Sequence, residues 1–231
     1  MKYLSLLLSV LLLISLAGCN GVNISEAEIT DFSTWLDSEG FVPSMSQSDL
    51  KNKMKGYIYE GKSVADSVRG GYYDGGFGGG FTGTNKNFYY GNDFAISGDK
   101  KTADYTNSFS TKVPLDNLVM PFSIEFGDTL LDVMHKLGVG TDPSSNLSIA
   151  LGLTYATTLY KDNRYSLVFN YSKNTANPSA PYELVFSENY VFPCSADKTS
   201  NVTRTITFTF SSEGKTLYQF SVKVHETYDY L

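Results

Sequence analysis

The stretch TITFTFSSEGKTLYQFSVKV, residues 205–224, decides the fold class of this chain. Apolar residues alternate with polar ones on both sides of a polar five-residue segment, 211–215. Alternation with a period of two predicts two antiparallel strands joined as a hairpin, with one buried face and one solvated face. The buried face is expected to hold Ile206, Phe208, Phe210, Tyr218, Phe220, Val222 and Val224. The solvated face is expected to hold Thr205, Thr207, Thr209, Gln219, Ser221 and Lys223.

Strand patterns of the same kind occupy most of the second half of the chain. Alternating apolar runs separated by turn residues predict three strands, around residues 149–153, 167–169 and 184–186. Further upstream, segments 87–96 and 104–113 predict another strand pair, with the first strand interrupted at Gly91. The chain is therefore expected to be rich in antiparallel sheet.

Three amphipathic helices are predicted from capping residues and from apolar residues at helical spacing. Their expected ranges are 25–40, 46–56 and 129–138, and each range ends at a glycine. Each helix begins with a serine or threonine that is followed three residues later by an acid: Ser25 with Glu28, Ser46 with Asp49, and Thr129 with Asp132. A short strand at 122–126 is predicted directly before the third helix.

Helices followed by meandering antiparallel strands predict an α+β fold, in which the sheet packs one apolar face against two or three short helices. Residues 25–231 are long enough to form a single domain of this kind. The helices that begin at Ser46 and Thr129 have matching apolar spacing, which favours two similar helix-plus-sheet repeats, 25–113 and 114–231. Any capped amphipathic helix would show this spacing, so a domain without a repeat stays open.

Residues 70–83 read GGYYDGGFGGGFTG, which is too rich in glycine to predict regular secondary structure. Positions 78–83 match a dinucleotide-binding fingerprint, but no buried strand precedes them and no helix follows, so no nucleotide site is predicted. We expect a loop whose aromatic rings either pack onto the sheet or act as anchors for a protein partner. The four rings are Tyr72, Tyr73, Phe77 and Phe81.

The first 18 residues have the pattern of a secretory signal peptide, with Lys2 before an apolar run. Leu16-Ala17-Gly18-Cys19 resembles the lipobox of bacterial lipoproteins. This resemblance implies cleavage before Cys19, acylation of Cys19 with palmitate-type chains, and a tether at 19–24. It also implies an outer-membrane location facing the periplasm, because Asn20 stands where an aspartate would favour retention in the inner membrane. An ordinary secretory peptide with an incidental cysteine is the alternative.

The stretch Phe126-Gly127-Asp128-Thr129, together with Val133 and Leu137-Gly138, looks like the helix-opening signature of another family. That family includes small outer-membrane lipoproteins and the β-lactamase-inhibitor-like repeat. The pattern departs from the family at Val139, where a proline usually stands. The resemblance implies a protein-binding module that has no chemistry of its own.

Charge and cysteine content narrow the choice of partner. The chain has a formal net charge of −6, which becomes 17 − 24 = −7 when residues 1–18 are removed with Lys2. An acidic body of this kind argues against nucleic acid and suits a basic protein. If Cys19 carries lipid, Cys194 has no partner within the chain, so it is either buried or paired with another chain.

No catalytic or metal-binding motif is found in the sequence. The only histidines, His135 and His225, lack the spacing of zinc ligands, and no cofactor is predicted. Glu125 with Asp128 or Asp132 would be the first candidate for a glycosidase pair, although acids at the start of a helix usually act as caps.

Together these patterns predict a membrane-anchored, non-enzymatic protein-binding module. An inhibitor or immunity protein against a toxin or a cell-wall-active enzyme is the leading interpretation. An envelope-assembly partner and a carboxylate-dependent hydrolase of cell-wall glycans are the alternatives.

Overall fold

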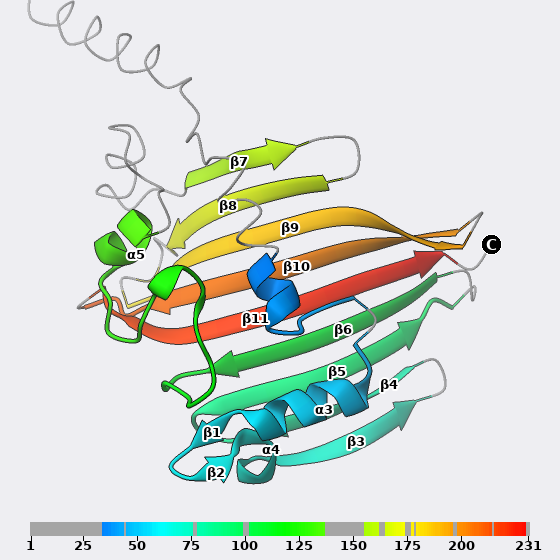
Figure 1. The fold of residues 1–231 in the computed structure, drawn as a ribbon. Coiled ribbons are helices and arrows are strands. Elements are labelled where there is room, and N and C mark those ends of the chain that lie inside the picture. Colours follow the sequence, from blue (N-terminus) through cyan, green and yellow to red (C-terminus); the bar gives the residue numbers. More distant parts are fainter. Residues whose placement is uncertain are drawn as a thin grey trace, which may run out of the picture.

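A computed structural model describes the backbone of residues 34–229, except 44, 76–77, 99–101, 137–154, 162–164, 174–176, 178, 196–197 and 214. Nine strands form one antiparallel sheet in the order β3-β4-β5-β6-β11-β10-β9-β8-β7 (Figure 1). Short helices pack against the sheet, so the predicted α+β class is confirmed.

The strands differ in length along the sheet. They are β3 (Arg69–Gly75), β4 (Gly78–Thr84), β5 (Phe88–Ile96), β6 (Thr102–Thr111), β7 (Tyr155–Lys161), β8 (Tyr165–Lys173), β9 (Tyr182–Ser195), β10 (Lys198–Phe210) and β11 (Leu217–Asp229). A separate two-stranded sheet pairs β1 (Ile58–Tyr59) with β2 (Lys62–Ser63). The helical elements are residues 34–38, α3 (Gln47–Gly56), α4 (Val64–Ser67), the 3₁₀ turn η1 (Pro121–Ser123) and α5 (Leu130–Lys136).

The sheet consists of two meanders that join at their last strands. Strands β3 to β6 pair in chain order, strands β7 to β11 do the same, and β6 pairs with β11. Each meander follows a capped helix, α3 in the first half and α5 in the second. This arrangement leaves β3 and β7 at the two edges (Figure 1). The division into two half-repeats stays a prediction.

The hydrophobic core lies between one face of the sheet and the helical elements. Buried side chains from the helices, such as Leu36, Leu50 and Val133, belong to the same cluster as buried side chains from the central strands. Trp35 packs edge-on against Phe220, with ring centroids 5.9 Å apart. The helical segments therefore cover the apolar face that the alternation of the strands produces.

The β10–β11 hairpin confirms the strand prediction, with one correction. Phe208 lies opposite Phe220 as the alternation requires. A register shift between Thr209 and Phe210 then places Leu217 opposite Phe210. Leu217 is buried in place of Tyr218, which is exposed, and Thr209 is buried although solvation was expected. Both predictions were wrong because this irregularity, which a period of two cannot show, changes which side chains face inward.

The predicted caps are formed at α3 and α5. The Ser46 hydroxyl accepts a hydrogen bond from the Asp49 amide at 3.1 Å, and the Asp49 carboxylate accepts one from the Ser46 amide at 3.1 Å. Thr129 and Asp132 make the equivalent pair at the start of α5. These bonds satisfy amide groups that have no partner within the helix.

Two local predictions upstream of α5 and in β5 were wrong. Residues 122–126 do not form a strand: Pro121 starts η1 and Phe122 has a left-handed backbone, with φ of 58°, which a strand cannot contain. Strand β5 is not interrupted at Gly91 but runs through it. A Cβ at Gly91 would lie 2.7 Å from the Tyr89 hydroxyl oxygen, so glycine makes room for that ring.

Several predictions lie outside the described residues. They concern the signal peptide, the tether with Cys19, the first part of helix 25–40, the strand at 149–153 and the end of the third helix at Gly138. The backbone of Cys194 belongs to β9, but its side chain also lies outside the described set. Among the helices that the structure describes, none has the length and apolar character needed to cross a membrane.

Candidate functional site

The glycine-rich segment 70–83 forms a regular hairpin, so the expectation of a loop was wrong. Strands β3 and β4 pair without any register shift from Arg69 opposite Thr84 to Gly75 opposite Gly78. Glycine is poorly suited to strands in general, but here it permits close packing. A Cβ at Gly83 would lie 2.7 Å from Val68 Cγ2 and 2.9 Å from Tyr90 Cε1.

The predicted aromatic anchors divide into two groups. Tyr72 is 71% exposed and Tyr73 is 51% exposed, and both belong to β3. Phe81, on β4, is half-buried and packs against the core cluster. Phe77 lies outside the described residues. Tyr72 and Tyr73 are therefore the two rings that are accessible to a partner, whereas Phe81 contributes to the fold.

A row of aromatic contacts runs from the exposed edge strand β3 toward the core. The centroids of Tyr72 and Phe81 are 5.0 Å apart, and those of Phe81 and Tyr90 are 5.4 Å apart. Because Tyr90 is buried, the row connects the edge of the sheet to the core. Tyr72 is thus held in position by packing although most of its surface is open, which lowers the entropy cost of binding through it.

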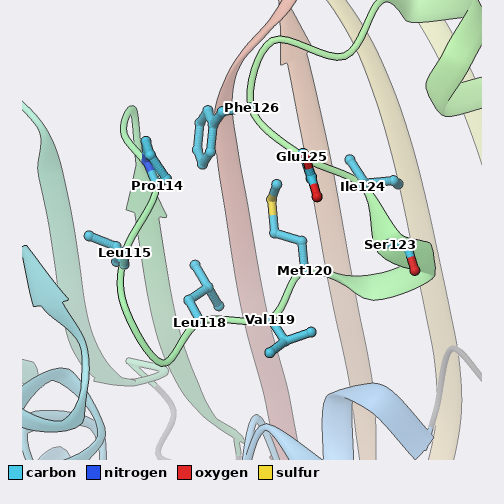
Figure 2. A pocket seen from close by; sticks show the side chains of 9 residues that line it. All are labelled: Pro114, Leu115, Leu118, Val119, Met120, Ser123, Ile124, Glu125 and Phe126. Carbon is cyan, nitrogen blue, oxygen red and sulfur yellow. The ribbon is translucent and has the colours of Figure 1, made fainter.

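A groove, which is a second candidate surface, lies inside the segment 114–126, which curves over the sheet (Figure 2). This groove has a volume of about 550 Å³. Leu115, Met120 and Ile124 form its buried part, while Val119 is 71% exposed. Its only charged lining residue is Glu125, whose carboxylate pairs with no basic side chain among the described residues.

Hydrogen bonds from side chains of two other elements hold the segment 114–126 in position. Trp35 Nε1 donates a hydrogen bond to the Val119 carbonyl at 2.9 Å, and Lys136 Nζ donates one to the Ser123 carbonyl at 2.9 Å. Phe122 and Ser123 both have left-handed backbones, with φ of 58° and 54°. The volume and apolar lining of the groove suit an apolar side chain.

A buried ion pair on the sheet was not predicted. Arg204 is 3% exposed and its Nε donates to the Glu188 carboxylate at 2.5 Å. The same guanidinium pairs with Asp37 and donates to the Phe41 carbonyl at 3.4 Å. It therefore attaches the N-terminal helical segment to the sheet. Burial acts to lower the pKa of Arg204, but hydrogen bonding and charge from Glu188 outweigh it and raise the pKa above its usual value.

The sequence did contain a signal for this pair. Arg204 is in phase with Ile206 and Phe208, so the alternation that predicted the hairpin also places Arg204 on the buried face. A charged residue at such a position needs a buried partner, but the sequence cannot identify Glu188 as that partner.

Three of the candidate catalytic and metal residues, Asp128, Asp132 and His225, are engaged in other contacts. Asp128 pairs with Lys136 at 2.7 Å, and Asp132 accepts hydrogen bonds from Thr129. His225 Nε2 lies 3.3 Å from Asp104. Among the described residues, no group of three or more histidine, cysteine or acidic side chains could hold a metal ion. The described acids at the start of α5 thus act in capping and pairing, as the helix-cap interpretation expects.

Comparison with protein-family models, curated proteins and solved structures finds no match to this chain.

Proposed function

We propose that the protein is a lipid-anchored, non-enzymatic binding protein of the periplasmic side of a bacterial outer membrane. In this proposal it captures a basic protein through the edge strand β3, which carries Tyr72 and Tyr73. The lipobox-like tetrad ending at Cys19 supports the anchor. The leading role is that of an inhibitor or immunity protein against a toxin or a cell-wall-active enzyme.

The observation that carries the proposal is the exposure of two adjacent tyrosines on a supported edge strand. Tyrosine combines a large contact area with few rotatable bonds, and it is enriched where proteins bind one another. Tyr72 is 71% exposed while its ring packs on Phe81. The formal charge of −6 would favour encounter with a basic partner.

Site-specific photocrosslinking in bacterial cells tests the binding surface. The full chain would carry p-benzoylphenylalanine in place of Tyr72 or of Tyr73, with Tyr218 replaced in the same way as the control. Tyr218 is also exposed, but it lies on β11, away from the β3–β4 hairpin. We expect a discrete protein adduct from positions 72 and 73 and none from 218. Absence of any adduct at 72 and 73 would refute the proposed binding surface.

The anchor is tested independently of the partner. Replacing Cys19 with serine should remove lipidation and move the protein from the membrane fraction to the soluble periplasmic fraction. Unchanged membrane fractionation of Cys19→Ser would show that the lipobox resemblance is misleading, without bearing on the tyrosines.

A further inference from the structure

We propose that the free edge of β3 binds an extended segment of a basic partner protein as a further strand of the sheet. This inference rests on the proposed function, because it specifies how a partner would bind at Tyr72 and Tyr73. The contacts would be backbone hydrogen bonds, which give affinity, and side-chain contacts on both faces, which give selectivity.

The hydrogen-bond pattern identifies which groups face outward. The Asn85 amide donates to the Phe88 carbonyl at 2.9 Å, and these residues continue the β4–β5 register. Because paired and unpaired positions alternate in an antiparallel ladder, odd-numbered residues of β4 bond to β5 and even-numbered ones bond to β3. Their partners on β3 are odd-numbered. The amide and carbonyl groups of Gly70, Tyr72 and Asp74 therefore point away from β4, and no described strand pairs with them.

This edge lacks the usual protections against strand addition. Natural edges are blunted by central charges, prolines, bulges or short length. Strand β3 has seven residues, no bulge and no proline, and its charges stand only at Arg69 and Asp74. The opposite edge strand, β7, differs because its pairing with β8 shifts register between Thr158 and Tyr160. Within the part of the chain that the structure describes, β3 is thus the edge strand whose pairing is regular over its full length.

The two tyrosines flank the edge on opposite faces. Tyr72 contacts Phe81, which packs toward the core face of the sheet. Tyr73 extends over the other face, where its hydroxyl lies 2.9 Å from the position that a Cβ on Gly80 would take. Successive strand residues point to opposite faces, so an added strand would lie between one ring on each side. This arrangement supplies the side-chain contacts that backbone pairing alone lacks.

Charge favours a basic partner segment over a second copy of this chain. Asp74 lies near the C-terminal end of β3, and Asp93 on β5 lies opposite Gly80 of the intervening strand β4. An antiparallel second copy of β3 would also bring its Arg69 toward Asp74, but two copies of a chain with formal charge −6 repel each other as wholes. A segment with several lysines or arginines would gain attraction to Asp74 and Asp93 without that repulsion.

The test removes an outward amide without removing a tyrosine. The full chain carrying p-benzoylphenylalanine at position 73 would be compared in cells with its Asp74→Ala and Asp74→Pro variants. Proline at 74 removes an amide that points outward and leaves the β3–β4 ladder bonds in place. We expect the adduct yield to fall about tenfold in Asp74→Pro beyond any fall in Asp74→Ala, since proline removes a hydrogen bond and adds a steric block.

A second pair of variants, at position 72, keeps the test valid if Asp74→Pro fails to fold. Tyr72→Pro and Tyr72→Ser both lack the ring, but only proline lacks the outward amide, so the proline variant should again give the lower yield. Slow amide hydrogen exchange at Gly71 and Tyr73 verifies that the hairpin is intact in each purified variant.

Each outcome decides the proposal. Selective loss with proline supports strand addition. Equal yields from the proline and the non-proline variants, with an intact hairpin, would overturn strand addition but leave the tyrosine surface standing. An adduct whose mass is that of two copies of this chain would overturn the basic partner in favour of self-pairing.

Discussion

Replacing Arg204 with methionine should strongly destabilise the fold, because it removes the ion pair that neutralises the buried Glu188 carboxylate. Glu188 is 1% exposed and lies directly opposite Arg204 in the β9–β10 pairing. Loss of one member of a buried ion pair typically costs about 3–5 kcal/mol. The second pair, to Asp37, adds less than about 1 kcal/mol because that carboxylate is largely exposed. We therefore expect the free energy of unfolding of Arg204→Met to fall by about 3–5 kcal/mol.

A double variant separates two contributions to the lost free energy of unfolding: the buried charge that remains on Glu188 and the loss of side-chain packing. Arg204→Met combined with Glu188→Leu removes both charges, and apolar replacements of buried pairs are often close to neutral. We expect the double variant to recover at least about 2 kcal/mol relative to Arg204→Met, which the double-mutant cycle measures as coupling.

Urea unfolding followed by fluorescence provides the assay. Trp35 is the only tryptophan, and it belongs to the helical segment that Arg204 attaches to the sheet. Its emission should therefore report both global unfolding and detachment of that segment. A loss below about 1 kcal/mol for Arg204→Met, the range of exposed pairs, would refute the argument that the pair is buried and coupled.

The remaining predictions concern caps, glycines and alkaline pH. Ser46→Ala and Thr129→Ala should each cost about 1 kcal/mol in thermal or urea unfolding, whereas Ser212→Ala, in a turn, should cost little. Gly83→Ala should destabilise the hairpin by about 1–3 kcal/mol because its Cβ would overlap Val68, and unchanged stability would contradict the close packing. Burial raises the pKa of Tyr190 to about 12, so the folded state holds a proton that the unfolded state loses near pH 10, and stability should fall between pH 10 and 12. Tyr190→Phe should show a smaller fall over that range in urea titrations at each pH.

Local patterns in the sequence predicted those elements whose physics is local. Capping boxes at Ser46 and Thr129 depend on residues three positions apart, so the sequence contains all the information they need. The β10–β11 alternation likewise follows from one buried face. Tyr218 was predicted to be buried in place of Leu217, because the register shift depends on how two strands pair, which a periodic pattern cannot show.

Elements that depend on distant partners were predicted less well. The glycine-rich hairpin becomes regular because Tyr90 and Val68 occupy the space that side chains on β4 would need. Composition shows only the intrinsic cost of glycine in a strand and not this compensation. Of the four proposed anchors, the sequence could not distinguish exposed Tyr72 from half-buried Phe81, because both lie in a glycine-rich segment that shows no periodic pattern of apolar residues.

Gly71 provides the last test, because the fold gives no reason for a glycine there. A Cβ at Gly71 would meet no atom within 4 Å, unlike one at Gly83. Glycine in a strand costs roughly 0.5–1 kcal/mol relative to alanine, so Gly71→Ala should stabilise the isolated protein by a similar amount. Gly71 lies beside the open edge, on the face that Tyr73 covers, and a bulky side chain there would fill space next to an added strand. Gly71→Ile should therefore keep or raise the midpoint of thermal unfolding while lowering the adduct yield at position 73. An unchanged yield with raised stability would show that the glycine serves neither folding nor binding.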